Sequence, residues 1–193
     1  MDIANNNNGI VKTSYIESIG ISSKTITTLV RKKQLKKISK GIYTVISFKD
    51  KYYIYQSRCR KGIYSHESAL YLNNLIKQEP KIYNITIVSH YNTRIITNEE
   101  CKYYYLKEDM VDVGKTEIYT KDNNLVVSYD TERGLLDLVI LRKKANKNVE
   151  YDKIIHYFKL YLKSKQKNIQ KLYEYAQKLD VVQELEYILA VIT

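Results

Sequence analysis

The 193-residue sequence has few cysteines and no long apolar run. Cys59 and Cys101 lie far apart without a C-x-x-C spacing, so they offer neither a zinc site nor a disulfide framework, which fits a reducing cytoplasm. No run of about 18 apolar residues could span a bilayer, and the start MDIANNNNG lacks the basic and apolar regions of a signal peptide. We therefore expect a soluble, cytoplasmic protein.

Common catalytic signatures are also missing. The sequence has no HExxH, no G-x-S-x-G and no glycine-rich phosphate loop. The segment closest to a metal-dependent nuclease is Glu100-Cys101-Lys102, a carboxylate and a lysine two residues apart, but residues 51–99 contain no Asp to complete a metal site. The histidines are isolated: His66, His90 and His156. We expect no catalysis, no metal and no cofactor.

Positive charge is what the sequence has in excess, and it is concentrated in its first part. Lys and Arg number 32 against 21 Asp and Glu, a formal net charge of +11. Residues 1–49 hold nine Lys or Arg against two acids, whereas residues 50–193 hold 23 against 19. An anionic partner is therefore expected to meet the first part of the chain.

Residues 20–43, GISSKTITTLVRKKQLKKISKGIY, predict a basic helix followed by a basic hairpin. Ser22 or Ser23 can cap the helix, and its apolar residues recur with the spacing of one buried face: Ile26, Leu29 and Val30. The opposite face carries hydroxyls and long cations able to reach base edges in a major groove. In LKKISKGIY, apolar residues alternate with lysines, and Gly41 can take the positive φ of a turn.

We interpret this hairpin as a wing that contacts phosphates. The DNA-binding residues predicted from the helix and the wing are Ser23, Lys24, Thr27, Thr28, Arg31, Lys32, Lys33, Lys36, Lys37 and Lys40.

A further predicted helix, residues 13–19, precedes the basic one. Ser14 and Glu17 have the spacing of a capping box, and the helix carries three apolar residues: Tyr15, Ile16 and Ile19. The alternative interpretation is a solvated amphipathic helix followed by an ordinary hairpin. The order of helix, glycine turn, basic helix and basic hairpin is typical of a winged helix-turn-helix and favours DNA binding.

The rest of the chain predicts a second domain of mixed structure. Because the charge balance changes near Asp50 and no Gly-rich or Pro-rich linker follows, we expect a winged helix-turn-helix domain over 1–49 directly joined to a C-terminal domain over 50–193. Helices are expected at 51–59 and 64–75. Short strands, expected to form a small mixed or antiparallel sheet, are predicted at 82–88, 102–106, 117–119 and 125–129.

From Thr131 onward the apolar period is helical and predicts four closing helices. Glu132, Arg133 and Asp137 are interpreted as charges at the start of the first of these helices, with Asp137 pairing locally. The expected fold class is thus α+β, an N-terminal winged helix-turn-helix followed by a C-terminal α/β domain with a small sheet and a helical C-terminus.

Four motifs in this order resemble the AbiEi antitoxins of bacterial type IV toxin–antitoxin, or abortive-infection, systems. They are ISKGIYTV at 38–45, GIYSHESALYLNNL at 62–75, Pro80 with the strand at 82–88, and YDTERGLLDLV at 129–139. The resemblance covers nearly the whole chain. The departures are a short N-terminal helix and Gly134, where a threonine or similar small residue is expected.

The resemblance implies a DNA-binding protein that represses its own operon at inverted repeats and acts in phage resistance. It implies a C-terminal domain needed for antitoxicity against a nucleotidyltransferase toxin, with no stable complex expected. A winged-helix regulator with a ligand-sensing C-terminal domain and a metal-dependent nuclease are the alternatives. The stretch 142–178, with eleven Lys or Arg against three acids, is either a solvated helical face or a further contact with DNA or RNA.

Overall fold

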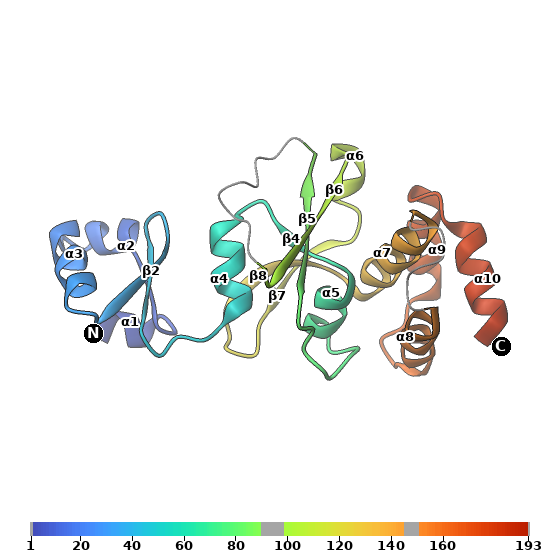
Figure 1. The fold of residues 1–193 in the computed structure, drawn as a ribbon, viewed down its shortest axis with the longest axis horizontal. Helices are drawn as coiled ribbons and strands as arrows, with labels where there is room; N and C mark the ends of the chain where they lie inside the picture. Colours follow the sequence, from blue (N-terminus) through green and yellow to red (C-terminus); the bar gives the residue numbers. More distant parts are fainter. Residues whose placement is uncertain (1, 90–98, 145–150, 193) are drawn as a thin grey trace. The chain divides into compact units, whose positions relative to one another are not determined.

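The computed structural model describes residues 2–89, 99–144 and 151–192 and shows an α+β protein (Figure 1). The chain forms two compact units. The first comprises Met1–Arg60 and Tyr119–Val126, and the second comprises Lys61–Ile118 and Val127–Thr193. The predicted boundary after residue 49 lies ahead of helix α4 (Lys51–Arg58), which belongs to the first unit. His90 and part of the basic stretch 142–178 lie outside the described residues.

The first unit contains a three-stranded antiparallel sheet in the order β1-β3-β2. Its strands are β1 (Ile10–Lys12), β2 (Leu35–Ser39) and β3 (Ile42–Val45). Its first three helices are α1 (Asp2–Asn6), α2 (Thr13–Ser18) and α3 (Ser23–Arg31). One apolar cluster takes a buried side chain from each helix and from two strands: Ala4, Val11, Ile16, Ile26 and Leu35. This core fixes the three helices to the sheet.

Helix α3 forms where the sequence predicts it. The Ser22 hydroxyl accepts a hydrogen bond from the Lys24 N–H at 3.3 Å and so caps the first turn. The helix ends where Lys33 adopts a φ of +56°, which lets the Lys33 and Gln34 N–H groups donate to carbonyls of the last turn. Of the predicted apolar face, Ile26 is buried, and Leu29 and Val30 pack half-buried against the same core.

The capping box expected for α2 is wrong. Its N-cap is Lys12, with no side-chain cap hydrogen bond among the described residues, and Ser14 lies exposed inside the helix, so no capping box forms. The Thr13 N–H donates instead to the Gly41 carbonyl at 2.9 Å. Only Ile16 is buried, whereas Tyr15 and Ile19 are 48% and 45% exposed, because six residues present just one side chain to the core.

The hairpin of β2 and β3 is confirmed, with Gly41 at a φ of +74° in its turn. The pairing register shifts between Lys37 and Ser39, as in a β-bulge. Lys36 and Lys37 lie before this shift and are both exposed.

Asp50 ties α4 to the returning segment of the first unit. Its buried carboxylate caps α4 by accepting from the Tyr53 N–H at 3.1 Å. The same carboxylate accepts from the Thr120 hydroxyl at 2.6 Å and from the Asn124 amide at 2.8 Å. Residues 119–126 are thereby held in the first unit by a fully hydrogen-bonded charge.

The second unit is built on a five-stranded sheet in the order β6-β5-β4-β8-β7. Its strands are β4 (Ile63–Tyr64), β5 (Tyr83–Val88), β6 (Cys101–Leu106), β7 (Lys115–Tyr119) and β8 (Leu125–Tyr129). Strand β4 runs antiparallel to β5 and parallel to β8, and β5 runs parallel to β6, so the sheet is mixed. No alternation marks β4 in the sequence, because two residues are too few to show one.

Helices surround α7 in the second unit, and the four predicted closing helices are present (Figure 1). The helices are α5 (His66–Leu72), the short α6 (Glu108–Val111), α7 (Thr131–Lys144), α8 (Tyr151–Lys163), α9 (Ile169–Lys178) and α10 (Val182–Ile192). Gly134 lets α7 approach α5 closely: a Cβ there would lie 3.0 Å from a Leu70 methyl group and 3.2 Å from the Ala69 Cβ.

Glu132 lies in the first turn of α7 and Asp137 pairs locally, as the sequence predicts, but all three charges at the start of this helix are buried. Glu132, Arg133 and Asp137 are 2%, 0% and 3% exposed. Arg133 does pair locally with Asp137 at 2.9 Å, but it also donates to the carbonyls of Met110 and Val113 at 2.9 and 2.8 Å. These contacts join α7 to the segment around α6, which the sequence spacing does not reveal.

Glu132 makes a second buried connection. Its carboxylate accepts from the Tyr161 hydroxyl at 2.9 Å and pairs with the Lys171 ammonium at 2.8 Å. Tyr161 lies on α8 and Lys171 on α9. A single buried charge therefore fixes two of the closing helices to the start of α7.

Candidate nucleic-acid interface and a cleft in the second unit

The predicted DNA-binding residues lie on one stretch of the first unit, from the start of α3 to the turn of the β2–β3 hairpin. We call this set the basic surface. Nine of its ten members are exposed, and Thr28 is half-buried. They are Ser23, Lys24, Thr27, Thr28, Arg31, Lys32, Lys33, Lys36, Lys37 and Lys40. Exposure leaves these side chains available to a partner.

The threonine hydroxyls on α3 are partly engaged within the helix. Thr27 donates to the Ser23 carbonyl at 3.3 Å and Thr28 to the Lys24 carbonyl at 3.1 Å. Their oxygens can still accept a hydrogen bond. Lys24 and Arg31 are consequently the long donors of the helix face, with Lys32 and Lys33 following at its end.

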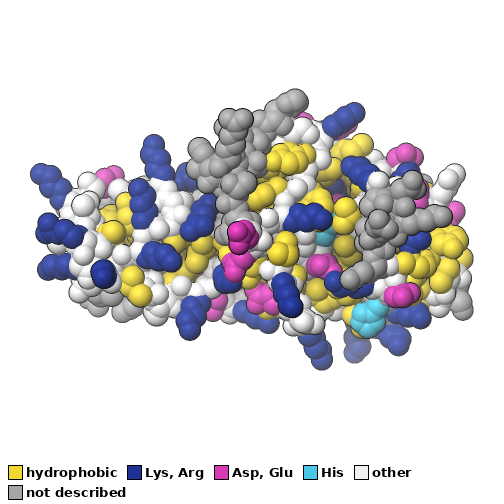
Figure 2. Space-filling model, viewed as in Figure 1, with side chains coloured by type: hydrophobic (Ala, Val, Ile, Leu, Met, Phe, Trp, Pro, Cys, Tyr) yellow, Lys and Arg dark blue, Asp and Glu magenta, His cyan; other side chains and the backbone are white. Residues whose placement is uncertain are grey.

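The charge of the basic surface is uncompensated in the sequence around it. No Asp or Glu occurs between Glu17 and Asp50, and this stretch carries eight Lys or Arg. Figure 2 shows Lys and Arg side chains gathered over the part of the molecule that carries α3 and β2. A surface of one sign attracts a polyanion and steers its approach.

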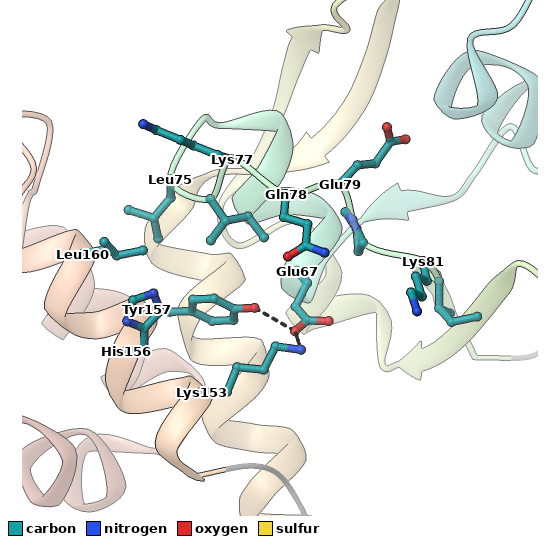
Figure 3. Close-up of a pocket in the computed structure, with 13 residues that line it drawn as sticks. Glu67, Leu75, Lys77, Gln78, Glu79, Lys81, Lys153, His156, Tyr157 and Leu160 are labelled. Atoms are coloured by element: carbon teal, nitrogen blue, oxygen red, sulfur yellow. Dashed lines mark hydrogen bonds and ion pairs between the residues drawn. The ribbon is translucent and has the colours of Figure 1, made fainter.

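A second candidate site lies wholly in the second unit. It is a cleft of about 730 Å³ between the segment after α5 and helix α8 (Figure 3). A smaller hollow of about 360 Å³ shares four lining residues with it: Glu67, Ile82, Lys153 and Tyr157. We call the two together the α5–α8 cleft. Clefts of several hundred cubic ångströms are the usual size for small-molecule sites.

Glu67 connects the two helices that border the α5–α8 cleft. Its carboxylate accepts from the Tyr157 hydroxyl at 3.0 Å and forms an ion pair with Lys153, as Figure 3 shows. Burial, followed by the charge of Glu67, raises the pKa of Tyr157 to about 12. Tyr157 therefore remains a hydroxyl donor at neutral pH.

His66 lines the smaller hollow of this cleft. It is 5% exposed, adopts a φ of +49° and stacks on the Tyr104 ring with the ring centres 3.8 Å apart. Burial lowers its pKa to about 4, although Asp137 opposes this shift. His66 is consequently neutral at pH 7, and its 4.0 Å approach to Asp137 is not an ion pair there.

The polar groups around His66 do not form a nucleophilic site. The His66 Nδ1 lies 2.9 Å from the Ser65 hydroxyl, but Ser65 is completely buried and cannot meet a substrate. The carboxylate and lysine expected of a nuclease, Glu100 and Lys102, flank Cys101 at the start of β6. Within residues 2–89, 99–144 and 151–192, no three His, Cys, Asp or Glu side chains gather as metal ligands would.

Sequence reasoning missed the α5–α8 cleft, because its lining comes from α5, the loop after it, two strands, α7 and α8. One signal was available. The motif at 62–75 contains His66 and Glu67, two ionisable residues at the start of a buried helix that has no other ionisable group except Tyr71. Such residues in a buried helix indicate a polar network or a site.

Residues 1–46 match the family described as "Transcriptional regulator, AbiEi antitoxin". The resemblance stated from the sequence is confirmed over this segment, which includes the entire basic surface. The family name itself describes transcriptional regulators and antitoxins.

The fold of nearly the whole chain is similar to that in the "Crystal structure of RV2827C protein from Mycobacterium tuberculosis". The two structures share a TM-score of 0.64 and 12% sequence identity over 98% of this chain and 74% of that chain. This similarity supports the α+β fold of the chain. No curated protein matches the chain at a significant level. Among the described residues, every helix is too short or too polar to cross a membrane.

Proposed function

We propose that the chain is a DNA-binding transcriptional repressor whose first unit acts as a winged helix-turn-helix. In this assignment α2 and α3 form the helix-turn-helix, and the β2–β3 hairpin is the wing. The observation that carries the proposal is the exposed basic surface, which lies entirely within the segment that matches the regulator family. Helix, turn, basic helix and basic hairpin follow the order of this class of DNA-binding domain.

In the proposed complex, α3 lies in the major groove with its exposed face toward the bases. Arg31 can donate two hydrogen bonds to a guanine edge, and Lys24 can reach a base or a phosphate. Lys36, Lys37 and Lys40 on the hairpin contact phosphates, which position the helix without reading sequence. Two copies bound to inverted repeats in its own promoter would repress the operon.

We further propose that the second unit supplies antitoxicity against a nucleotidyltransferase toxin, without a stable complex between the two proteins. The support is the resemblance of the motifs at 62–75 and 129–139 to type IV antitoxins. This role, in phage resistance, requires access to the chromosome and thus a cytoplasmic location. We propose no enzymatic activity, in keeping with the buried Ser65 and the scattered acidic residues.

The test is the affinity of the purified full chain for its promoter DNA. Arg31→Ala should weaken specific binding by about 1–3 kcal/mol and relax the base preference at one position. Lys49→Ala is the matched control, because Lys49 is an exposed cation outside the basic surface. An Arg31→Ala footprint and affinity identical to those of the wild type would show that α3 does not occupy the groove.

A further inference from the structure

The α5–α8 cleft has an apolar floor that no described part of the chain fills. Its apolar lining comes from the end of the α5 segment, the start of the strand that follows and the outer face of α8: Leu75, Ile76, Pro80, Ile82 and Leu160. Ile82 remains 42% exposed. An apolar surface of this kind gains free energy when a ligand removes it from water.

The two acidic groups of the cleft have different partners within the second unit. Glu67 is paired with Lys153 and accepts from the Tyr157 hydroxyl. Glu79 accepts from the Tyr83 hydroxyl at 2.7 Å and from the Tyr71 hydroxyl at 3.5 Å. These hydroxyls are neutral and Glu79 is exposed, so Glu79 keeps its negative charge, whereas the charge of Glu67 is paired.

The remaining charge of the cleft is positive. Four lysines line its two parts, Lys77, Lys81, Lys102 and Lys153, against the two glutamates. Lys153 is occupied by Glu67, which leaves a formal excess of two positive charges on the rim. In Figure 3 the Lys77 ammonium points away from Glu67, which leaves Lys81 in the larger hollow and Lys102 in the smaller one.

The smaller hollow of the cleft also holds polar groups of fixed orientation. The Tyr104 hydroxyl donates to the Asn84 side-chain oxygen at 3.2 Å, and its ring stacks on His66. Lys102 lies over the Tyr104 ring with its ammonium 5.2 Å from the ring centre. A few fixed polar groups beside an apolar floor are what orients a ligand in a small-molecule site.

We propose that the α5–α8 cleft binds a small organic anion, with its apolar body on the floor of the cleft and its acidic group at one of the two lysines that line the two hollows, Lys81 or Lys102. The ligand must match both the apolar floor and the positive charge of the cleft. An inorganic anion would leave the floor in water, and an uncharged apolar molecule would leave the lysines without a counter-charge. The site gives the second unit a ligand-binding function in addition to the proposed toxin response.

The probe is 8-anilinonaphthalene-1-sulfonate, an aromatic anion whose fluorescence increases in an apolar site, titrated against the full chain. Saturable binding at one site per chain is expected. Lys81→Ala/Lys102→Ala should weaken this binding about tenfold or more, the reduction typical of removing hydrogen bonds to a charged group. N-phenyl-1-naphthylamine, the uncharged analogue, should bind more weakly than the sulfonate and should change little in the double variant.

Two control variants, each lacking a pair of lysines, distinguish binding in the cleft from nonspecific attraction of the anionic probe to a basic protein. Lys159→Ala/Lys178→Ala removes two exposed charges of the second unit that do not line the cleft, and Lys36→Ala/Lys37→Ala removes two from the basic surface. Neither pair should change the affinity. A filling substitution on the floor, Leu160→Trp, should weaken the sulfonate and the uncharged analogue alike.

The proposal is overturned if no saturable binding occurs, or if all three lysine pairs lower the affinity equally. It is equally overturned if only Lys36→Ala/Lys37→Ala lowers it, because the probe would then occupy the basic surface. Circular dichroism of each variant confirms that the comparison is between folded proteins.

Discussion

His66 occupies a backbone conformation and an environment that are both costly for a histidine. Its φ of +49° lies in the left-handed region, which side chains other than Gly, Asn and Asp rarely adopt. Asp137 and Glu67 favour the protonated ring, whereas Lys102, Arg133 and burial oppose it, and burial is the largest of these effects. The chain therefore keeps a neutral imidazole packed under Tyr104 in the α5–α8 cleft.

This burial predicts a specific loss of stability in acid. The pKa of His66 is lowered to about 4 in the folded chain from the usual 6.5, so between these values the unfolded chain takes up a proton that the folded chain does not. The contribution of the neutral His66 to the free energy of unfolding is complete above about pH 6.5 and is lost as the pH falls toward 4. The loss amounts to at most about 3 kcal/mol. His66→Asn tolerates the positive φ and removes the titration, so its unfolding free energy should depend less on pH in this window.

Urea unfolding at pH 4.5–7.5 measures the difference between the two proteins. His156→Asn is the control, because His156 is exposed on α8, and this variant should keep the pH dependence of the wild type. Parallel pH profiles for wild type and His66→Asn would contradict the assigned state of His66.

At the scale of the element, the β2–β3 hairpin presents three exposed lysines, Lys36, Lys37 and Lys40. Lys36 and Lys37 pair regularly with Thr44 and Tyr43, so their side chains leave opposite faces of the hairpin, and Lys40 follows in the turn. The cations available to phosphates are therefore spread over both faces and the turn.

Replacing Lys36, Lys37 and Lys40 together by alanine should weaken binding to all DNA sequences alike. Removing one lysine–phosphate interaction reduces the slope of log affinity against log salt by about 1, so the slope of the triple variant should fall by about 3. The measurement is binding to operator and to unrelated DNA over a range of salt. An unchanged slope would assign the phosphate interactions to other residues.

A triple variant of equal charge, with Lys159, Lys163 and Lys178 replaced by alanine, extends this measurement to α8 and α9. It distinguishes the two interpretations of the basic stretch 142–178. A reduced slope would indicate contact with the nucleic-acid backbone, and an unchanged slope would indicate a solvated face.

The elements that the sequence predicts are those whose signal is local. Helix α3 is predicted by the cap at Ser22 and by the spacing of Ile26, Leu29 and Val30. The four closing helices are predicted by the helical period of their apolar residues. Strands β1 and β4 have three and two residues, too few for a period, and their positions depend on partners elsewhere in the chain.

The two candidate sites also differ in whether the sequence could predict them. The basic surface is contiguous in sequence, so its residues could be named from it. The burial of Arg133 could not be predicted from the adjacent residues. It depends on hydrogen bonds to the carbonyls of Met110 and Val113, some twenty residues away in the chain. The α5–α8 cleft likewise exists only after α8 has packed beside α5.

At the scale of the whole molecule, repression and antitoxicity should be separable. The basic surface lies in the first unit, whereas the motifs that resemble an antitoxin at 62–75 and 129–139 lie in the second. Full-length Lys24→Ala/Arg31→Ala should therefore lose repression of a promoter reporter and still protect cells that express the toxin. Loss of both activities in a folded double variant would show that antitoxicity depends on operator binding.

A fragment of residues 50–193 provides the complementary measurement and should protect without repressing. This fragment keeps Asp50 with both of its distant partners, Thr120 and Asn124. Asp50→Ala in the same fragment controls for that interaction, and it should lower the fragment's stability because two buried donors lose their acceptor.

The return of residues 119–126 to the first unit limits how recombination between related genes can exchange the two units. The chain passes between the units at three places, after residues 60, 118 and 126. A single recombination breakpoint near residue 60 would transplant the first unit without Thr120 and Asn124, and the recipient would carry an Asp50 whose carboxylate lacks two of its hydrogen bonds. Exchange of the DNA-reading part between related genes is then expected to succeed only when the incoming Asp50 meets a compatible pair in the resident chain, so this small returning segment limits which chimaeras survive.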